Sequence, residues 1–273
     1  MKGLISGIKR MEIHDGDGLR TTVFLKGCPL KCVWCHNPES ISFEKQTAFF
    51  KDICIGCGIC NNEHNEQTAA KCPSEALVAY GTEYTSEELV KELLKDEQFF
   101  KNGHGGVTLS GGECLAQGEF AFEIAKLLSQ KGISVYIDTC GFVKREIIEK
   151  IIPYVDKFLY DIKAIDEDVH VRCTGQSNMI IMENLKYING QNVPIEIRIP
   201  YVPGYNDNQI EKIGSFLTAF KCITAVKILP YHNYAASRYL ALGMKNSLPG
   251  IIPSEEEINI AKEKIRAFGF VCK

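Results

Sequence analysis

The sequence lacks any long uninterrupted apolar run, so we expect no membrane-spanning segment. It also lacks a strong excess of charge, because 31 Lys and Arg against 34 Asp and Glu give a net charge of −3. That balance gives no bulk electrostatic reason to expect nucleic acid or an anionic membrane as a partner. The N-terminal run MKGLISGIKRMEIHDGDG lacks the apolar segment and cleavage site of a secretion signal, which favours a cytoplasmic location.

Without a secretion signal, the twelve cysteines are expected to be metal ligands and reduced thiols, and not a disulfide framework. A hydrophobic content of 45% and a charged content of 24% are typical of a globular protein with a sizeable core. The length of 273 residues suits one large domain, or one domain with an insert.

Three cysteines, Cys28, Cys32 and Cys35, are spaced C-x3-C-x2-C within the run GCPLKCVWCHN. A tight loop lets three thiolates bind three irons of a [4Fe–4S] cluster, which four cysteines normally close. One iron then keeps an open coordination position, which is typical of a catalytic metal site and not of a structural one. A molecule with an amino and a carboxylate group could bind at that position. The alternatives are ordinary buried thiols, or three of four zinc ligands.

This triplet, with Trp34 just before Cys35, resembles the cluster motif of radical S-adenosylmethionine (SAM) enzymes. The longer runs 13–28 (IHDGDGLRTTVFLKGC) and 35–39 (CHNPE) resemble the activating enzymes of glycyl radical enzymes, the pyruvate formate-lyase activating enzyme family. Asp17 stands where that family usually has proline. We expect this change to loosen a turn and to affect no ligand.

Apolar and β-branched runs alternate with helical patterns from residue 107 onward, which predicts βαβ units and a parallel sheet. Six strands are too few for a closed eight-stranded barrel, so we predict a partial, open (β/α)6 barrel, as the resemblance also implies. A capping-box pattern at Thr85–Glu88 predicts a helix start. The strands are expected at 21–25, 107–109, 134–138, 158–161, 195–199 and 225–229, and the later helices near 117–130, 144–152, 179–188, 208–220 and 255–268.

Several motifs lie at the C-terminal ends of these strands, which is where the active sites of such barrels are found. In Gly111-Gly112-Glu113 the paired glycines allow close backbone approach to a ligand, and free carbonyls can accept from an ammonium group. A plain strand–helix turn is the alternative. Behind the cysteine triplet, these residues resemble the motif that binds the SAM amino group, with Cys114 as an inert replacement for a usual proline.

The resemblance also places Asp161, Ile162 and Lys163 in the SAM site, and Asp138 with Thr139 where a monovalent cation is held. The alternative for Asp161 and Lys163 is an ion pair closing the barrel rim. Arg198 carries a fork suited to a carboxylate, and either binds SAM or pairs with an acidic residue of the rim.

His232 lies in a block that resembles the family's adenosine-contacting segment, and Trp34, Cys35 and His36 are assigned to the same cofactor site by resemblance. His170, by contrast, is expected on a helix surface and not as a ligand.

A second group, Cys54, Cys57 and Cys60, has ferredoxin-type spacing, and Cys72 before Pro73 resembles the end of such a loop. We predict an auxiliary [4Fe–4S] cluster in an insert at 48–80 that interrupts a radical SAM core of 1–273. His64 is an alternative fourth ligand, and zinc is an alternative metal. Such a cluster would either relay electrons or build a docking surface. Cys140, Cys173, Cys222 and Cys272 are expected to be buried or incidental thiols.

The resemblance implies an oxidoreductase that reductively cleaves SAM to a 5′-deoxyadenosyl radical, which removes hydrogen from a backbone glycine of a partner enzyme. It implies a monomer reduced by flavodoxin or ferredoxin, in an anaerobic or facultative cell. One alternative is a radical SAM enzyme that acts on a small molecule. Another is an iron–sulfur electron carrier or sensor, which would need neither the glycine turn nor the strand-end acids and lysine.

Overall fold

The computed structural model describes residues 1–273, and its centre is an eight-stranded sheet in the order β10-β9-β8-β7-β6-β2-β1-β5. Six neighbouring strands run parallel, and they are the six that the sequence predicts. The end strands β10 and β5 do not pair with each other, so the sheet is an open barrel as predicted. The parallel strands are β2 (Arg20–Leu25), β6 (Gly106–Gly111), β7 (Ser134–Thr139), β8 (Lys157–Asp161), β9 (Ile195–Tyr201) and β10 (Ile223–Pro230).

Two antiparallel strands that the sequence reading missed extend the sheet. β1 (Lys2–Glu12) pairs with β2, and β5 (Thr82–Thr85) pairs with the other edge of β1. The register of β1 against β2 is interrupted twice, and its later residues are exposed. A strand of this kind gives no clean period-two pattern, which explains why it was missed.

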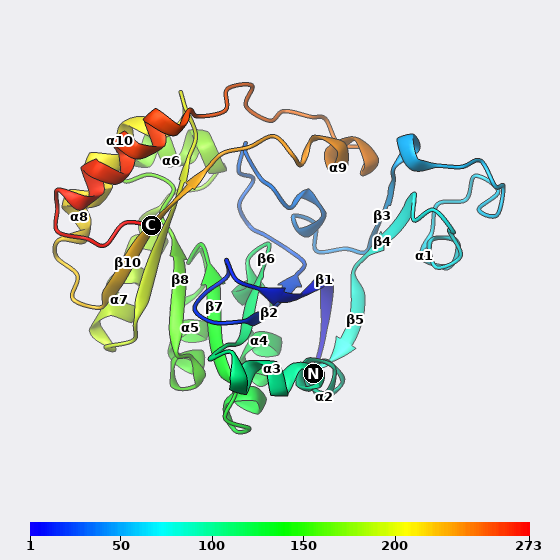
Figure 1. The fold of residues 1–273 in the computed structure, drawn as a ribbon, viewed down its shortest axis with the longest axis horizontal. Coiled ribbons are helices and arrows are strands. Elements are labelled where there is room, and N and C mark those ends of the chain that lie inside the picture. Colours follow the sequence, from blue (N-terminus) through cyan, green and yellow to red (C-terminus); the bar gives the residue numbers. More distant parts are fainter.

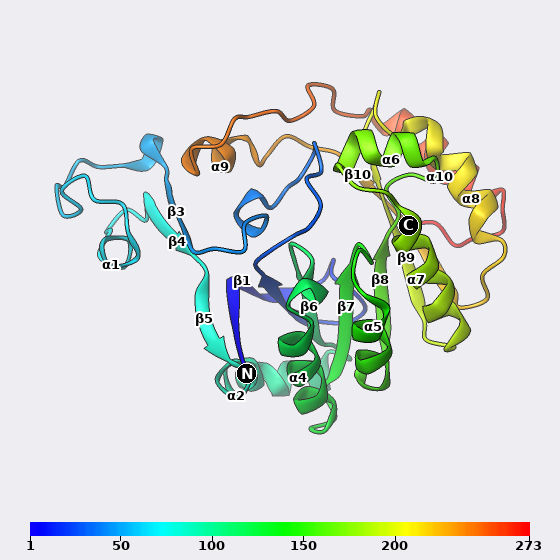
Figure 2. The same cartoon turned by 180° about the vertical axis from the view of Figure 1, so that it is seen from behind.

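Helices α4, α5 and α7 cover one face of the sheet, the face nearer the viewer in Figure 2. They bury the aliphatic side chains of the parallel strands, such as Leu109 and Ile137, and full burial of each stabilises the fold by about 1.5–3 kcal/mol. The helices are α2 (Ser86–Leu93), α3 (Glu97–Asn102), α4 (Gly118–Ser129), α5 (Arg145–Ile151), α6 (Glu167–Thr174), α7 (Met179–Gly190), α8 (Ile210–Leu217), α9 (Ala236–Ala241) and α10 (Glu255–Arg266).

The predicted capping box begins α2. The side-chain oxygen of Thr85 accepts from the backbone N–H of Glu88, and the Glu88 carboxylate accepts from the N–H of Thr85.

The second cysteine group lies in a separate projection at one end of the molecule, far from α8 and α10 (Figure 1). Its base is the antiparallel pair β3 (Gln46–Phe49) and β4 (Leu77–Tyr80). The chain that connects these two strands contains the short helix α1 (Glu66–Ala69). No helix of the structure has both the length and the apolar character that a bilayer crossing requires.

Candidate active site

One cavity of about 220 Å³ lies at the C-terminal ends of the parallel strands. The cysteine loop contributes Cys28, Cys32 and Cys35, together with Trp34 and His36. The ends of β6, β7 and β8 contribute Gly111, Gly112, Asp138, Asp161 and Lys163, and Arg198 comes from within β9, level with Asp161. Residues that lie far apart in the sequence therefore meet in one place, as their positions at strand ends predicted.

The cysteine loop follows β2 in the sequence, and backbone hydrogen bonds join its first residues to its last ones. The N–H of Gly27 donates to the carbonyl of Ser40 at 2.8 Å, and the N–H of Cys28 donates to that of Ile41 at 3.1 Å. The buried ammonium of Lys26 adds a bond to the carbonyl of Glu39 at 2.6 Å. These contacts join the start of the loop to its end, so the three thiols lie on one closed turn of chain.

Burial raises the pKa of all three thiols, that of Cys35 to about 12 and those of Cys28 and Cys32 as well. The cavity therefore does not stabilise thiolates by itself, and a bound cation would have to do so. A set of three thiols lining one cavity suits an iron–sulfur cluster with one open iron, so the residues fit the group that the motif implies.

Cys140 is a fourth thiol in this cavity, and the sequence reading missed it. It follows the end of β7 and is buried, and burial raises its pKa. It has no ligand spacing to the triplet, because the strand end and not the local sequence places it there.

The two glycines of the turn after β6 are required by close packing. A Cβ on Gly112 would overlap the carbonyls of Ser40 and Gly27, and Gly111 has a φ of +118°. The turn therefore packs directly on both ends of the cysteine loop.

Glu113 does not line the cavity, although it was assigned to the cofactor site. Its fully buried carboxylate accepts from the hydroxyl of Thr139 at 2.7 Å and from the N–H of Cys140 at 2.8 Å. It therefore fixes the end of β7, which carries Asp138. Ile162 is also buried in the core and does not line the cavity.

Arg198 pairs with acidic residues in this structure, one of the two alternatives that the sequence left open. Its guanidinium lies 3.3 Å from Asp138 and 3.6 Å from Asp15. Burial raises the pKa of Asp138 to about 6, against the opposing effect of Arg198. The Nε atom of Arg198 is buried without a hydrogen-bond partner.

Lys163 and Asp161 form an ion pair of 2.6 Å at the end of β8. Burial alone would lower the pKa of this lysine, but the adjacent Asp161 raises it, so Lys163 is charged. A buried ammonium and two carboxylates thus lie on neighbouring strand ends in the same cavity.

His36 and His232 are stacked, with ring centroids 3.9 Å apart and ring planes at 13°. Burial lowers the pKa of both, that of His36 to about 4, so both rings are neutral near pH 7. His232 does not itself line the cavity, but it stacks on His36, which does.

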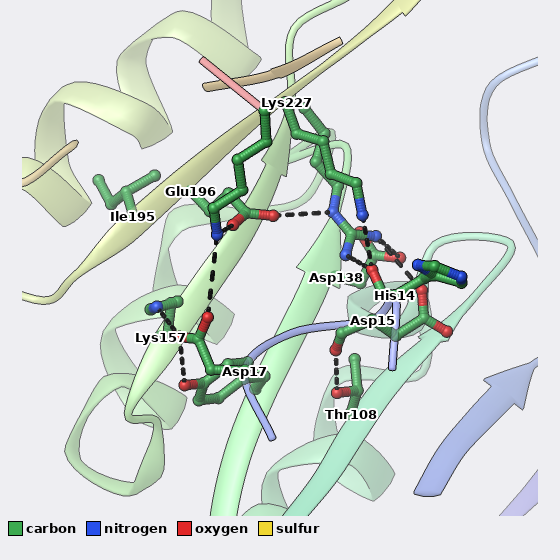
Figure 3. Close-up of polar contacts among 12 residues, drawn as sticks. His14, Asp15, Asp17, Thr108, Asp138, Lys157, Ile195, Glu196 and Lys227 are labelled. Carbon is green, nitrogen blue, oxygen red and sulfur yellow. Dashed lines mark hydrogen bonds and ion pairs between the residues drawn. The ribbon is translucent and has the colours of Figure 1, made fainter. Parts of the chain in front are cut away.

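The loop between β1 and β2 crosses over the parallel strands and contacts side chains of several of them (Figure 3). The carbonyl of Asp15 accepts from Thr108 at 2.7 Å, and the carbonyl of His14 accepts from Lys227 at 2.9 Å. Asp17 pairs with Lys157 and accepts from the Tyr136 hydroxyl. The side chain of Asp17 therefore joins the loop to β7 and β8, a role that the expectation of a loosened turn did not include.

His170 lies on α6, but its expected place on the helix surface was wrong. The side chain is 1% exposed, and its Nδ1 atom lies 2.7 Å from the carbonyl oxygen of Gln176. It does not line the cavity.

The second cysteine group lines a separate cavity of about 230 Å³ in the projection. Cys54, Cys57, Cys60 and Cys72 all line it, and His64 does too. Backbone donors, first that of Leu77, lower the pKa of the Cys72 thiol. Neither cysteine group brings three or more side chains together at the spacing that a single metal ion needs.

Comparisons with known proteins bear on the whole chain. The radical SAM superfamily matches residues 22–217. The chain is 39% identical over its full length to the trans-4-hydroxy-L-proline dehydratase activating enzyme of Clostridioides difficile, of which 99% is covered. It is 34% identical over 91% of its length to the choline trimethylamine-lyase activating enzyme of Oleidesulfovibrio alaskensis, of which 90% is covered.

Among solved structures, a domain of a pyruvate-formate lyase-activating enzyme from Bacteroides vulgatus has a TM-score of 0.52 and 27% identity. That match covers 62% of this chain and 98% of the other. The extent and the level of these similarities place the chain in the radical SAM superfamily and, within it, among the activating enzymes of glycyl radical enzymes.

Proposed function

We propose that the cavity at the strand ends is where this enzyme generates the radical for a glycyl radical enzyme. The observation that carries the proposal is the meeting of the C-x3-C-x2-C thiols with the glycine turn and the strand-end charges in one cavity. Enzymes of this family use a [4Fe–4S] cluster and SAM. When bound, these cofactors supply a 5′-deoxyadenosyl radical, which removes a hydrogen atom from a backbone glycine of the partner.

Cys28, Cys32 and Cys35 would hold the cluster, and the backbone of the turn at Gly111 and Gly112, which lines the same cavity, would bind the amino group of SAM. In support, this turn packs on both ends of the cysteine loop, so the thiols and the backbone of the turn have a fixed relative position.

The strand-end charges would orient SAM. Lys163 and Arg198 supply cationic groups for a carboxylate, and Asp161 supplies an acceptor for hydroxyl groups. Asp138 and Thr139 supply oxygens for a monovalent cation. Glu113 acts on this set indirectly, since it fixes the hydroxyl of Thr139.

The aromatic residues Trp34 and His36 would contact the adenosine part of SAM, with His232 stacked behind His36. Both histidines are neutral, so they offer flat apolar faces and no charge. The buried Trp34 and the half-buried His36 line the cavity beside the thiols, and both would help to exclude water from the place where a radical would form.

We further propose that residues 48–80 are an auxiliary insert with a second [4Fe–4S] cluster on Cys54, Cys57, Cys60 and Cys72. The shared cavity supports this set, and His64 lies in the same cavity as an alternative fourth ligand. Flavodoxin or ferredoxin would be the electron donor, and the enzyme would act as a monomer in the cytoplasm.

The client is proposed from the relatives. The identity of 39% to a trans-4-hydroxy-L-proline dehydratase activating enzyme covers practically all of both chains. A glycyl radical dehydratase of that substrate class is therefore the first client to test, ahead of a choline lyase.

The test is anaerobic reconstitution with iron and sulfide, followed by dithionite and SAM. We expect 5′-deoxyadenosine from the native chain, none after Cys32→Ala, and continued production after Cys140→Ala. Addition of the dehydratase should give a glycyl radical signal in EPR. SAM cleavage stimulated by a metabolite, with no radical on any client, would instead support a small-molecule enzyme, and absence of cleavage would support an electron carrier.

A further inference from the structure

The cysteine loop is held by a helix end as well as by β2. The N–H of Lys31 donates to the carbonyl of Thr174 at 2.8 Å, and the N–H of Val33 donates to that of Cys173 at 2.9 Å. Lys31 and Val33 are the two neighbours of Cys32. The last carbonyls of α6 therefore fix the backbone on both sides of the central cysteine.

His170 determines the shape of this helix end. A carbonyl oxygen can only accept, so the Nδ1 atom 2.7 Å from the Gln176 carbonyl carries the hydrogen. The Thr174 hydroxyl lies 3.1 Å from the same nitrogen and donates to the carbonyl of His170 at 2.9 Å. Gly175 then ends the helix with a φ of +78°.

Side-chain packing joins the same two segments. Val169 and Cys173 of α6 are in one apolar cluster with Trp34 of the cysteine loop. Trp34 also lines the proposed active site. A change at the end of α6 would therefore reach both the backbone beside Cys32 and the wall of the cavity.

We propose that His170 is a positioning residue for the N-terminal cluster, acting through the end of α6. The inference rests on the proposed function only in that Cys28, Cys32 and Cys35 hold that cluster. In this arrangement the amides of Lys31 and Val33 point at carbonyl oxygens, so they are not free to donate to sulfur. N–H donors to sulfur favour the more negative, reduced cluster, so engaging these two amides keeps the reduction potential low.

The first test needs no cluster. Hydrogen exchange of the metal-free protein is compared between the native chain, His170→Ala and His170→Asn, because the asparagine amide can replace the Nδ1 donor. We expect exchange at Lys31 and Val33 to become about tenfold faster in the alanine variant and to return close to native in the asparagine variant. Thr174→Val, which removes the hydroxyl in a similar shape, should act like alanine.

Asn189→Ala is the matched control. The side-chain Oδ1 atom of Asn189 also joins a helix end to a loop, since it accepts from the N–H groups of Lys221 and Cys222, but Asn189 does not line the cavity. This variant should lower the melting temperature to a similar extent without changing exchange at Lys31 and Val33.

The second test is a redox titration by EPR, in a background with Cys54→Ala and Cys57→Ala so that one cluster is observed. We expect His170→Ala to raise the midpoint potential, and His170→Asn and Asn189→Ala to leave it unchanged. Native exchange and native potential in both His170→Ala and Thr174→Val would overturn the inference. If the background protein shows no cluster at all, the proposed function fails, while the exchange experiment still tests the role of His170.

Discussion

The side chains at the centre of the cavity are charged groups that are already paired with one another. Arg198 lies between Asp138 and Asp15, and Lys163 pairs with Asp161. Breaking one such pair leaves the other charge buried, which costs more than the pair contributes. A substitution at one of these residues should therefore change the stability of the metal-free protein, and it should change cofactor binding as a separate effect.

Asp138 provides a pH test of this point. Its pKa rises from an ordinary value of 3.8 to about 6, because burial disfavours the charged form. The folded chain then binds more protons than the unfolded chain between these values, so stability falls as pH rises from 4 to 6 and is level above. The effect is at most about 3 kcal/mol.

Asp138→Asn should remove this slope, which melting temperatures of the metal-free protein between pH 4 and 8 would measure. Asp52→Asn, a change at an exposed carboxylate, should keep it. SAM binding should weaken in Asp138→Asn at all pH values. An unchanged slope in that variant would mean that another group titrates in this window.

Asp17 is a second residue with a defined pH effect, of opposite sign. The hydrogen bond from Lys157 lowers its pKa, although burial opposes it. Its contribution to stability is therefore present above the ordinary carboxyl pKa and is lost as pH falls through the lowered value.

Because Asp17 is half exposed, its pair with Lys157 should contribute no more than about 1 kcal/mol, and less at high salt. Asp17→Asn should lower the melting temperature slightly at pH 7 and by less at pH 3, where the pH has fallen below the ordinary carboxyl pKa. An equal loss at both pH values would show that the side chain acts through packing and not through its charge.

Among the structural elements, the turn after β6 is tightly constrained by its neighbours. The overlap of a Gly112 Cβ with two carbonyls involves backbone atoms, which no side-chain rotation can relieve. Gly112→Ala should therefore push the turn away from the cysteine loop and cost about 2–4 kcal/mol.

The measurement for Gly112→Ala is thermal unfolding together with iron content after reconstitution, and both should fall. Gly7→Ala, in β1 of the same sheet, is the control, because nothing lies within 4 Å of its added Cβ. A Gly112→Ala protein with native iron content would show that the turn can shift without disturbing the thiols.

How far the sequence predicts an element depends on where its contacts come from. Strands β6 to β10 are buried between layers, so they appear as apolar runs and were predicted within a few residues. β1, β3 and β4 depend on edge pairing and on the insert, and no periodic pattern reveals them. The cysteine spacing and strand-end motifs are local signals, but the contacts of Glu113, Cys140 and the β1–β2 loop arise only when distant segments fold together.

At the scale of the whole molecule, the two cysteine groups lie in different structural settings. The first is enclosed by the parallel sheet, α6 and the glycine turn, whereas Cys54 and Cys57 are exposed in a projection joined to the core at β3 and β4 (Figure 1). The strands β3 and β4 form a two-stranded sheet of their own and are not part of the eight-stranded sheet of the core. If the projection holds a metal, as proposed, that metal should therefore be separable from the metal of the core.

Replacing Cys57 and Cys60 together by serine tests this separation. Iron per chain after reconstitution should fall by roughly half if the insert holds a [4Fe–4S] cluster. Cleavage of SAM with dithionite should persist, because a small reductant can reach the core cluster directly. A full loss of iron would show that the two sites assemble as one unit, and unchanged iron with loss of zinc would assign zinc to the insert. If SAM cleavage persists with dithionite but fails with flavodoxin or ferredoxin, electrons enter through the insert. If SAM cleavage persists with dithionite and with the protein donor, and only activation of the client fails, the insert contacts the client.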